Sequence, residues 1–248
     1  MDEKQLDRYS RQIRLPQIGE AGQQKILDAS VLIIGMGGLG SPAALYLAAG
    51  GIGRLVISDY DVVEASNLQR QIIHTSASIG ELKVDSAKRA IESLNPDCRV
   101  ESVNYQIEGD ELKSIIGGVD IVLDCSDNFP TRFEVNRNCV ERETPLVSGA
   151  AIRLEGQIMN YQPGVGGPCY QCLYTQVYEN AETCEMEGVL GPVVGVIGTM
   201  QALQTLLILT GRGEPLIGRL LLLDAANLEW QAVNLTKNPA CPVCGTQA

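Results

Sequence analysis

Residues 31–59 have the sequence VLIIGMGGLGSPAALYLAAGGIGRLVISD, in which two apolar segments enclose a glycine-rich turn and an alanine-rich stretch. The pattern predicts a buried strand at 31–34, a helix at 41–49 and a second strand at 55–58. The turn matches G-x-G-x-x-G, and Asp59 follows it by about twenty positions. Glycines let backbone N–H groups approach a phosphate, and the helix start adds roughly half a positive charge. The stretch therefore predicts a nucleotide-binding strand, loop and helix.

Strand and helix patterns continue to alternate after this stretch. Helix-like segments at residues 81–94 and 130–142 lie between short apolar segments typical of strands. Repeated strand-then-helix order predicts an α/β, Rossmann-like fold with a mostly parallel sheet and helices on both faces. Ligands of such sheets bind at the carboxyl ends of the strands, where we expect the glycine loop, Asp59 and Asp127.

Beyond this core the pattern changes, and further strands are predicted at residues 157–161 and 219–223. We expect one domain over residues 1–248. Its three parts are an N-terminal arm at 1–30, a nucleotide-binding Rossmann-like core at 31–165 and a zinc-stabilised C-terminal part at 166–248.

The composition is that of a globular protein, with 248 residues of which 45% are apolar and 20% charged. Its formal charge of −11 repels phosphate backbones, so a nucleic-acid partner is not expected. No secretory signal pattern occurs at the N-terminus, and a cytoplasmic location is expected. Residues 189–211 are uncharged and long enough to span a bilayer, but their Pro, Gly and Gln residues favour a buried helix at about 193–210 over a membrane span.

Four of the eight cysteines form two C-x-x-C pairs, Cys169 with Cys172 and Cys241 with Cys244. Two such turns can present four thiolates to one ion, which is typical of a closed structural zinc site. A redox pair is the competing interpretation, although it needs only one C-x-x-C and a thioredoxin-like context.

The other cysteines carry weaker signals. Cys98, Cys125 and Cys139 lie in apolar or helical segments and are expected in the core. Cys184 lies in a polar segment and could be a nucleophile, but neighbouring glutamates disfavour its thiolate, so both roles stay open. The only histidine, His74, excludes a multi-histidine metal site.

Charged residues around the expected loop favour phosphoryl or nucleotidyl transfer, in which cations and metal-bound carboxylates neutralise oxygens that gain charge. Each residue alone has a simpler explanation: a basic residue as a solvated surface charge, Asp59 as a ribose ligand, and Asp127 as a turn or helix cap. The cations are Arg11, Arg14, Arg70 and Lys83.

Five motifs together are similar to one known family. They are RYSRQ at 8–12, GMGGLG at 35–40, SNLQRQ at 66–71, DCSDN at 124–128 and the paired C-x-x-C turns. In this combination the chain resembles the bacterial ubiquitin-activating-enzyme-like adenylyltransferases over nearly its whole length.

The resemblance implies a reaction between ATP and the C-terminal Gly-Gly carboxylate of a small ubiquitin-like β-grasp sulfur carrier, giving an acyl adenylate and pyrophosphate. Residues 148–158 and 180–181 favour the branch that serves molybdenum cofactor biosynthesis, whose carrier is the small subunit of molybdopterin synthase. The thiamine-pathway carrier is the alternative. A separate sulfur donor is also implied, because the chain ends soon after Cys244.

Roles follow from the resemblance residue by residue. Arg11 would reach the neighbour's ATP across a homodimer, Arg70 and Lys83 would contact phosphates, Asp127 would hold Mg²⁺, and Cys184 would be a reactive thiol of variable importance. The remaining nucleotide-binding positions are Gly35, Gly37, Gly38, Gly40, Asp59, Ser66, Asn67, Leu68, Gln69 and Asn128.

Two other classes of function stay open. An NAD-dependent oxidoreductase would account for the glycine loop and Asp59. A non-catalytic, zinc-stabilised binding module would account for the paired C-x-x-C turns, although the charged residues speak against lost catalysis.

Overall fold

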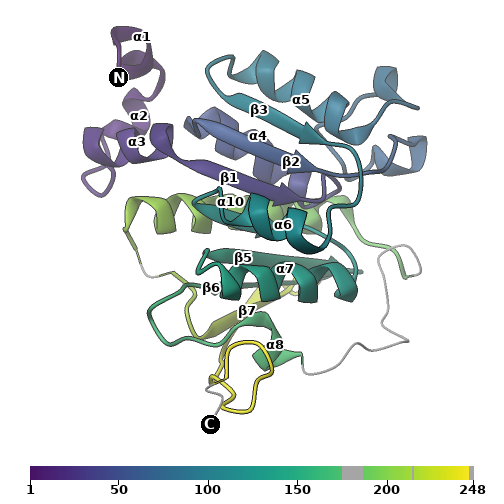
Figure 1. The fold of residues 1–248 in the computed structure, drawn as a ribbon. Coiled ribbons are helices and arrows are strands. Elements are labelled where there is room, and N and C mark those ends of the chain that lie inside the picture. The colour runs from purple at the N-terminus through teal and green to yellow at the C-terminus, as the bar shows by residue number, and fades with distance from the viewer. Residues whose placement is uncertain (175–186, 214, 246–248) are drawn as a thin grey trace.

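The computed structural model describes residues 1–174, 187–213 and 215–245 (Figure 1). Within them the chain forms one sheet in the order β3-β2-β1-β4-β5-β6-β7-β8. The first five strands in this order are parallel, and each pairing from β5 to β8 is antiparallel. The strands are β1 Ser30–Ile34, β2 Arg54–Ser58, β3 Arg99–Val103, β4 Ile121–Asp124, β5 Leu146–Ile152, β6 Glu155–Tyr161, β7 Arg219–Asp224 and β8 Glu229–Asn234.

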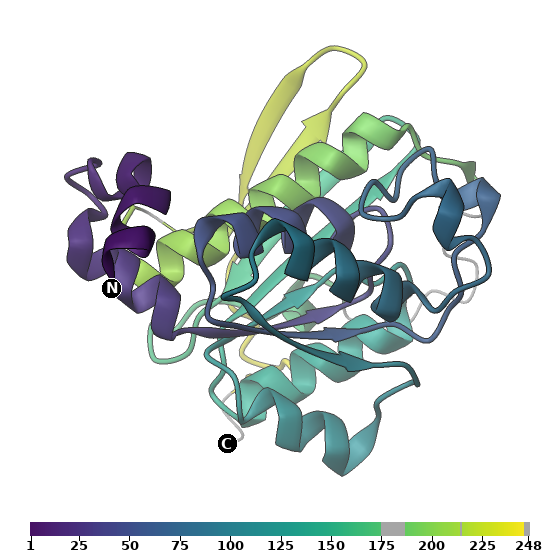
Figure 2. The same ribbon diagram turned by 90° about the horizontal axis from the view of Figure 1, so that it is seen from above.

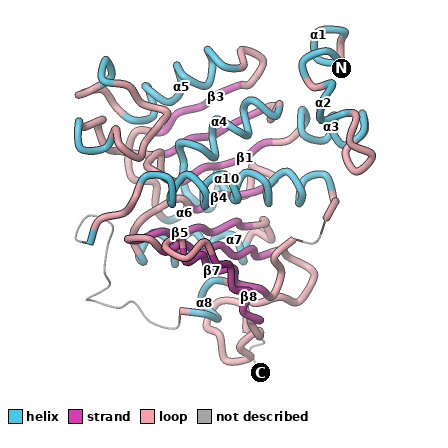
Figure 3. Tube along the Cα trace, turned by 180° about the vertical axis from the view of Figure 1, so that it is seen from behind, coloured by secondary structure: helices cyan, strands magenta, loops and turns pink. Residues whose placement is uncertain are grey.

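Helices cover both faces of the sheet, as predicted; α4, α5 and α10 lie on the face seen in Figure 3, and α6 and α7 on the other. The helices are α1 Glu3–Arg8, α2 Ser10–Ile13, α3 Gly19–Asp28, α4 Gly40–Gly50, α5 Lys83–Leu94, α6 Gly109–Ile116, α7 Phe129–Glu141, α8 Tyr170–Leu173 and α10 Gly191–Thr210. The mostly parallel α/β fold with additional strands is therefore confirmed. The sequence patterns missed α6, β8 and the short helices α1, α2 and α8.

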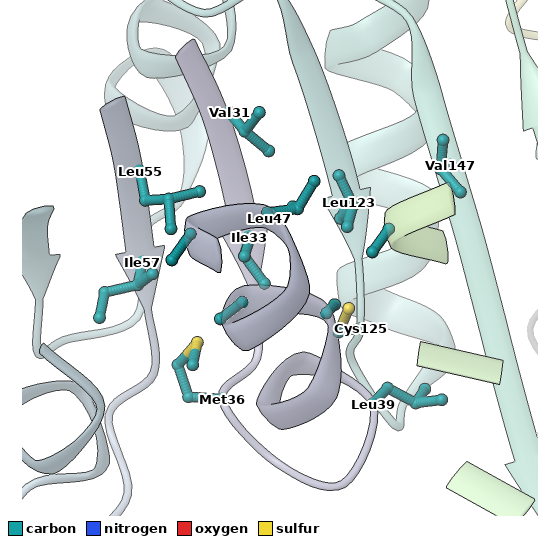
Figure 4. Close-up of a cluster of buried hydrophobic side chains, with 14 of the residues drawn as sticks. Val31, Ile33, Met36, Leu39, Leu47, Leu55, Ile57, Leu123, Cys125 and Val147 are labelled. Carbon is teal, nitrogen blue, oxygen red and sulfur yellow. The ribbon is translucent and has the colours of Figure 1, made fainter. Parts of the chain in front are cut away.

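The central strands are apolar throughout because successive side chains enter two different cores. In β1, Val31 and Ile33 pack with α4 and its neighbours, whereas Leu32 and Ile34 pack on the opposite face. Figure 4 shows the first core, where Leu47 of α4 lies over Val31 and Ile33. This double burial fixes β1, and with it the loop that follows.

The helix α10 has the length and composition of a membrane span, but half of its most apolar window is buried inside the structure. Its fully buried Gln201 donates from Nε2 to the carbonyl oxygen of Asp124 at 2.8 Å. Helix α10 also packs along α4 and beside β5. The predicted buried helix is confirmed.

The N-terminal arm and the last hairpin lie at the periphery of the sheet. Helices α1 to α3 precede the amino end of β1, and the buried Tyr9 hydroxyl accepts a hydrogen bond from Asn95 Nδ2 at 3.0 Å (Figure 1). Strands β7 and β8 form a hairpin that extends away from the helices (Figure 2).

Candidate nucleotide and metal sites

The loop after β1 requires glycine at several positions. Gly35 has φ of 93°, and a Cβ there would lie 2.8 Å from the carbonyl oxygen of Cys125. A Cβ at Gly40 would lie 1.9 Å from the carbonyl oxygen of Gly35, so the helix start and the turn are in direct contact. A Cβ at Gly38 would meet Val194 of α10 at 2.8 Å. Gly35, Gly38 and Gly40 thus keep the loop close to β4 and α10.

A cleft of about 1220 Å³ opens beside this loop at the carboxyl ends of β1, β2 and β4, and it continues to the β7–β8 hairpin. Several predicted nucleotide-binding residues line it together. They are Gly35, Gly37, Gly38, Asp59, Asn67, Arg70, Lys83, Asp127 and Asn128.

Lys83, the first residue of α5, is buried beside the cleft with only 6% of the residue exposed. Its Nζ lies 2.7 Å from Oδ2 of Asp61, whose side chain is 54% exposed. The backbone N–H of Lys83 also donates to the carbonyl oxygen of Asp61 at 2.9 Å. The alternative of a solvated surface charge is therefore wrong for Lys83, because the ammonium is held at the wall of a cleft.

Asp59 follows β2 and faces the glycine loop. Its Oδ2 accepts the Met36 N–H at 2.7 Å and its Oδ1 accepts the Asp61 N–H at 2.9 Å. Burial is the main cause that raises the pKa of Asp59, and the charge of Asp61 adds to it, against the opposing influence of Lys83 and of the two backbone donors. The carboxylate therefore links the loop to the end of β2 and still borders the cleft.

Asp127 is exposed in the cleft, where β4 passes into α7. The helix cap is Asn128, whose Oδ1 accepts the Thr131 N–H at 3.0 Å, so the interpretation of Asp127 as the cap is wrong. Burial is the main cause that raises the pKa of Tyr60, and the charges of Asp61, Asp127 and Asp59 raise it further. Three carboxylates therefore gather at this end of the cleft.

Other predicted positions lie outside the cleft lining. Gly40 shapes the turn. Ser66 is exposed, and its carbonyl oxygen accepts a hydrogen bond from Arg70 Nη1 at 3.1 Å. Leu68 is half-buried. Gln69 is exposed, with its carbonyl oxygen beside Gly191. These residues shape the segment that carries Asn67 and Arg70.

Arg11 lies far from this cleft in its own chain. It is exposed on α2, with the N-terminal helices that precede the amino end of β1, whereas the cleft lies at the carboxyl ends of the strands (Figure 1). Arg14 is also exposed. Among the four predicted cations, Arg70 and Lys83 line the cleft.

Gln71 and Arg132 are buried polar residues of the cleft lining that the motifs did not single out as site residues. Gln71 is 4% exposed and its Oε1 is buried without a partner in the described part of the chain. Arg132 is 8% exposed, and its Nε is also unpartnered there. Gln71 follows directly after Arg70 in its motif, which was a usable signal, whereas no pattern distinguishes Arg132 within its helix.

The lone histidine has no free ring nitrogen. His74 Nε2 lies 3.1 Å from the Met36 carbonyl oxygen and Nδ1 lies 3.0 Å from Ser86 Oγ. The carbonyl can only accept, so Nε2 carries the proton and Nδ1 accepts from the hydroxyl. His74 therefore holds the Met36 carbonyl oxygen of the glycine loop and does not line the cleft.

The two C-x-x-C turns meet, as predicted. Their four sulfur atoms lie within 4.8 Å of one another, with Cys169 and Cys241 Sγ 3.7 Å apart and Cys172 and Cys244 Sγ 3.3 Å apart. Four thiolates around one zinc ion at about 2.3 Å give sulfur separations of about 3.8 Å. The sulfur geometry therefore fits one tetrahedral ion, and the convergence of both turns disfavours a separate redox pair.

Hydrogen-bond donors approach this cluster, which we call the cysteine knuckle (Cys169, Cys172, Cys241, Cys244). Asn136 Nδ2 of α7 donates to Cys169 Sγ at 3.5 Å and the Asn238 N–H donates to Cys172 Sγ at 3.4 Å. Such donors orient metal-bound thiolates. The knuckle attaches the end of the chain to α7 and α8.

The remaining cysteines agree with the core prediction where they are described. Cys98, Cys125 and Cys139 are all buried, and burial raises each thiol pKa, to about 11 for Cys98. They are therefore poor nucleophiles. Cys184 lies outside the described residues.

These features define an α/β protein with a cleft at the glycine loop and with four cysteines whose sulfur atoms are spaced to suit one metal ion. A model of the ThiF family matches residues 9–243. The chain belongs to the ThiF family, as the motifs predicted. It is 43% identical over 245 residues to the molybdopterin-synthase adenylyltransferase of Escherichia coli K12, covering 99% of this chain and 98% of the relative.

Other relatives are equally similar. The sulfur carrier protein ThiS adenylyltransferase of Escherichia coli K12 is 44% identical, with 99% and 97% of the two chains covered. The SAMP-activating enzyme E1 of Haloferax volcanii is 44% identical, with 99% and 91% covered. A crystal structure of Escherichia coli MccB with AMPCPP and MccA shares the fold, with TM-score 0.84, 23% identity and coverage of 99% and 77%.

Proposed function

We propose that this protein is a cytoplasmic adenylyltransferase that uses ATP to activate the C-terminal Gly-Gly carboxylate of a small ubiquitin-like sulfur-carrier protein. The observation that carries the proposal is the buried Lys83 ammonium, which borders the same cleft as the glycine loop, Arg70 and Asp127. Relatives that match almost the whole chain are adenylyltransferases for sulfur carriers, which supports this reaction over hydride transfer or a non-catalytic module.

In the reaction, a carboxylate oxygen of the carrier attacks the α-phosphorus of ATP. A new C–O–P linkage forms, the bond to the bridging oxygen breaks, and pyrophosphate leaves with the electron pair. Lys83 and Arg70 reduce the repulsion between the two anions and neutralise the leaving group. Asp127 would hold Mg²⁺, which supplies further charge stabilisation at the phosphates.

The reaction needs no general base, because the carrier carboxylate is already ionised at neutral pH. This agrees with the only histidine, His74, being buried with both nitrogens engaged. Asp59 is positioned beside the loop to accept a ribose hydroxyl, since each oxygen retains a lone pair beyond its backbone donor.

The length of the cleft suits two reactants. From the glycine loop it continues past Gln157 and Tyr174 to Trp230 of β8. Tyr174 donates its hydroxyl to Gln157 Oε1 at 2.9 Å, so an aromatic and polar wall borders the far part. We assign the loop end to ATP and the far part to the extended carrier tail.

Arg11 enters the proposal through a homodimer. Because it lies at the opposite end of the sheet from its own cleft, it could reach an ATP only in a neighbouring subunit. Mixing Arg11→Ala with Asp127→Ala tests this. If each site takes Arg11 from the partner, statistical mixing gives about one quarter of wild-type activity, although each variant alone is inactive. No recovery on mixing would contradict the shared site.

Zinc is the proposed ion of the cysteine knuckle, because four thiolates without an open position are typical of structural zinc. Its role would be to hold the chain end on α7 and α8 rather than to catalyse. Cys184 and a separate sulfur donor belong to steps after adenylate formation.

The carrier we propose is the small subunit of molybdopterin synthase, and the thiamine-pathway carrier is the alternative within the same chemistry. Each candidate carrier is incubated with enzyme and ATP, and intact-mass spectrometry measures the adenylate adduct. An adduct on the molybdopterin-synthase subunit supports the assignment, whereas an adduct only on the thiamine carrier would assign the protein to thiamine biosynthesis.

Pyrophosphate exchange into ATP tests the reaction class. Exchange should depend on added carrier and fall by about a thousandfold in Asp127→Ala, because a metal-holding carboxylate is lost. The matched control is Asp97→Ala, which removes an exposed carboxylate outside the cleft lining. Absence of exchange with every Gly-Gly carrier, together with tight NAD binding, would overturn the proposed function.

A further inference from the structure

Arg132 stands out among the cleft residues because its guanidinium is buried. It lies in the first turn of α7, four residues after the Asn128 cap, and the residue is 8% exposed. Burying a charged group is costly unless it is paired and hydrogen-bonded. Its contacts therefore indicate what the charge holds in place.

On one side, Arg132 holds the turn that carries Asp127. Its Nη2 donates to the carbonyl oxygen of Ser126 at 2.7 Å. The Ser126 N–H and hydroxyl donate to Asp124 Oδ1 at 3.1 Å and 2.6 Å. Ser126, the residue before Asp127, is thus held at its N–H, at its hydroxyl and at its carbonyl oxygen, and the orientation of the Asp127 side chain depends on these contacts.

On the other side, Arg132 contacts the residue that follows the first cysteine of the knuckle. Its Nη1 donates to Tyr170 Oη at 3.4 Å, and Tyr170 is the residue that follows Cys169. The Tyr170 N–H donates to Asn136 Oδ1 at 2.9 Å, and Asn136 Nδ2 donates to Cys169 Sγ. Arg132 and Asn136 are four residues apart, on one side of α7.

Aromatic rings pack around the contact between α7 and Tyr170 and restrict its movement. The Tyr170 ring meets Phe133 edge to face, with centroids 5.9 Å apart, and lies 4.9 Å from the Tyr174 ring. Phe129 contacts both Phe133 and Tyr174. A shift of the knuckle would therefore move the first turn of α7 with it.

The buried guanidinium of Arg132 remains charged. Burial alone would lower the pKa of Arg132, but the charge of Asp124 and the contact with Tyr170 raise it above its ordinary value. Buried charged groups are weak evidence for stability, because replacing them by well-packed apolar residues is often neutral or stabilising. Stability therefore does not explain this arrangement, and the geometry of the held turn does.

We infer that Arg132 is a positioning residue that fixes Asp127 for its metal ion and that Tyr170 connects this hold to the cysteine knuckle. The inference rests on the proposed function, because Asp127 is assigned to magnesium there. It predicts that losing the Arg132 contacts weakens nucleotide binding only where the metal takes part.

The test is Arg132→Lys, which keeps the charge but cannot bridge Ser126 and Tyr170. ATP affinity is measured by calorimetry with Mg²⁺ and in magnesium-free buffer without chelator, so that the knuckle metal stays bound. We expect about a tenfold loss of affinity with Mg²⁺, the size of one hydrogen bond to a charged group, and no change without it. The matched control is Arg137→Lys, an exposed arginine on the same helix, which should change neither value.

Two further variants separate positioning from folding. Tyr170→Phe removes only the hydroxyl and should cause a smaller loss of the same Mg²⁺-dependent kind, with the metal content of the knuckle unchanged. If Arg132→Lys does not fold, this variant carries the test. In the double variant with Asp127→Ala, the Arg132→Lys change should add nothing, because both act through Asp127.

The outcomes distinguish a failure of the proposed function from a failure of the positioning role. If the wild-type protein binds no ATP, the proposed function is wrong. If it binds ATP with the expected Mg²⁺ dependence but Arg132→Lys and Tyr170→Phe lose nothing, or lose equally with and without Mg²⁺, the positioning role is wrong.

Discussion

The cysteine knuckle and the nucleotide end of the cleft are both rich in polar groups, but these groups are paired to different degrees. In the knuckle, the four sulfur atoms converge and two of them receive hydrogen bonds from Asn136 and Asn238, although Gln171 Oε1 in the first C-x-x-C turn is buried without a partner among the described residues. In the cleft, Gln71 Oε1 and Arg132 Nε are buried without a partner among the described residues. Lys83 is paired there with a largely exposed carboxylate.

This difference separates two kinds of site. Groups that converge on one ion complete a structure, whereas groups left without partners in a cleft await a ligand that completes them. Substitutions in the knuckle should therefore cost mainly stability, and substitutions in the cleft should cost mainly activity.

The largest expected effect is on stability, from Cys169→Ser. Structural zinc contributes about 10 to 16 kcal/mol of apparent binding free energy in small domains, and loss of one thiolate should remove several kcal/mol of it. Metal content by mass spectrometry and the free energy of unfolding in urea measure this. The control is Cys98→Ser, a buried thiol outside the knuckle, which should leave metal content unchanged. Full metal occupancy in Cys169→Ser would contradict the assignment.

Next is a loss of activity without a loss of stability, from Lys83→Met. Removing the ammonium should slow carrier-dependent pyrophosphate exchange by about a thousandfold, as for other groups that stabilise developing charge. Unfolding free energy should stay within about 1 kcal/mol of wild type or rise, because the exposed Asp61 can return to water. Lys88→Met, a half-buried position on the same helix and outside the cleft lining, is the control. A loss of stability without a loss of exchange would reverse the comparison.

Two buried glutamines give a smaller and more selective comparison. Gln201 is fully paired, with Nε2 donating to the Asp124 carbonyl oxygen and Oε1 accepting from Cys125, whereas Gln71 Oε1 has no partner among the residues that the structure describes. Gln201→Leu should therefore destabilise the protein by about 1 to 3 kcal/mol, and Gln71→Leu should be neutral or stabilising.

Function should respond in the opposite sense. Gln71→Leu should weaken ATP binding by about tenfold, because leucine cannot accept the hydrogen bond that bound ATP would donate to Gln71 Oε1. Urea unfolding and calorimetry measure the two effects in both variants. Equal losses of stability would show that Gln71 is an ordinary core residue.

The sequence predicted most of this frame, because its signals are local. The run of residues 31–34, the glycine loop and the positions of Asp59 and Asp127 at strand ends follow from periodicity and from the geometry of parallel sheets. The paired C-x-x-C turns were equally informative, since thiolates at that spacing share an ion.

Other features depend on contacts between distant segments and leave no local pattern. β8 is mostly exposed and half of its residues are polar, so its strand is fixed by pairing with β7 rather than by an apolar face. Lys83 is buried because the segment after β2 crosses it, with Val62 bridged to Leu82. Arg132 occupies an ordinary helical position, and only the meeting of α7 with the knuckle gives it a role.

The smallest expected effect is a pH dependence of stability that arises from His74. Its Nε2 holds the Met36 carbonyl oxygen of the glycine loop, and the ring itself does not line the cleft. Burial is the main cause that lowers the pKa of His74 from 6.5. As pH falls below about 6.5, the unfolded chain binds a proton that the folded chain does not, so stability declines until the lower folded pKa is reached. The slope cannot exceed about 1.4 kcal/mol per pH unit, because one proton is involved. Urea unfolding between pH 7.5 and about pH 5.5 should show this decline in the wild type and a shallower one in His74→Gln. Identical slopes in the two proteins would place the pH dependence in the carboxylates of the cleft instead.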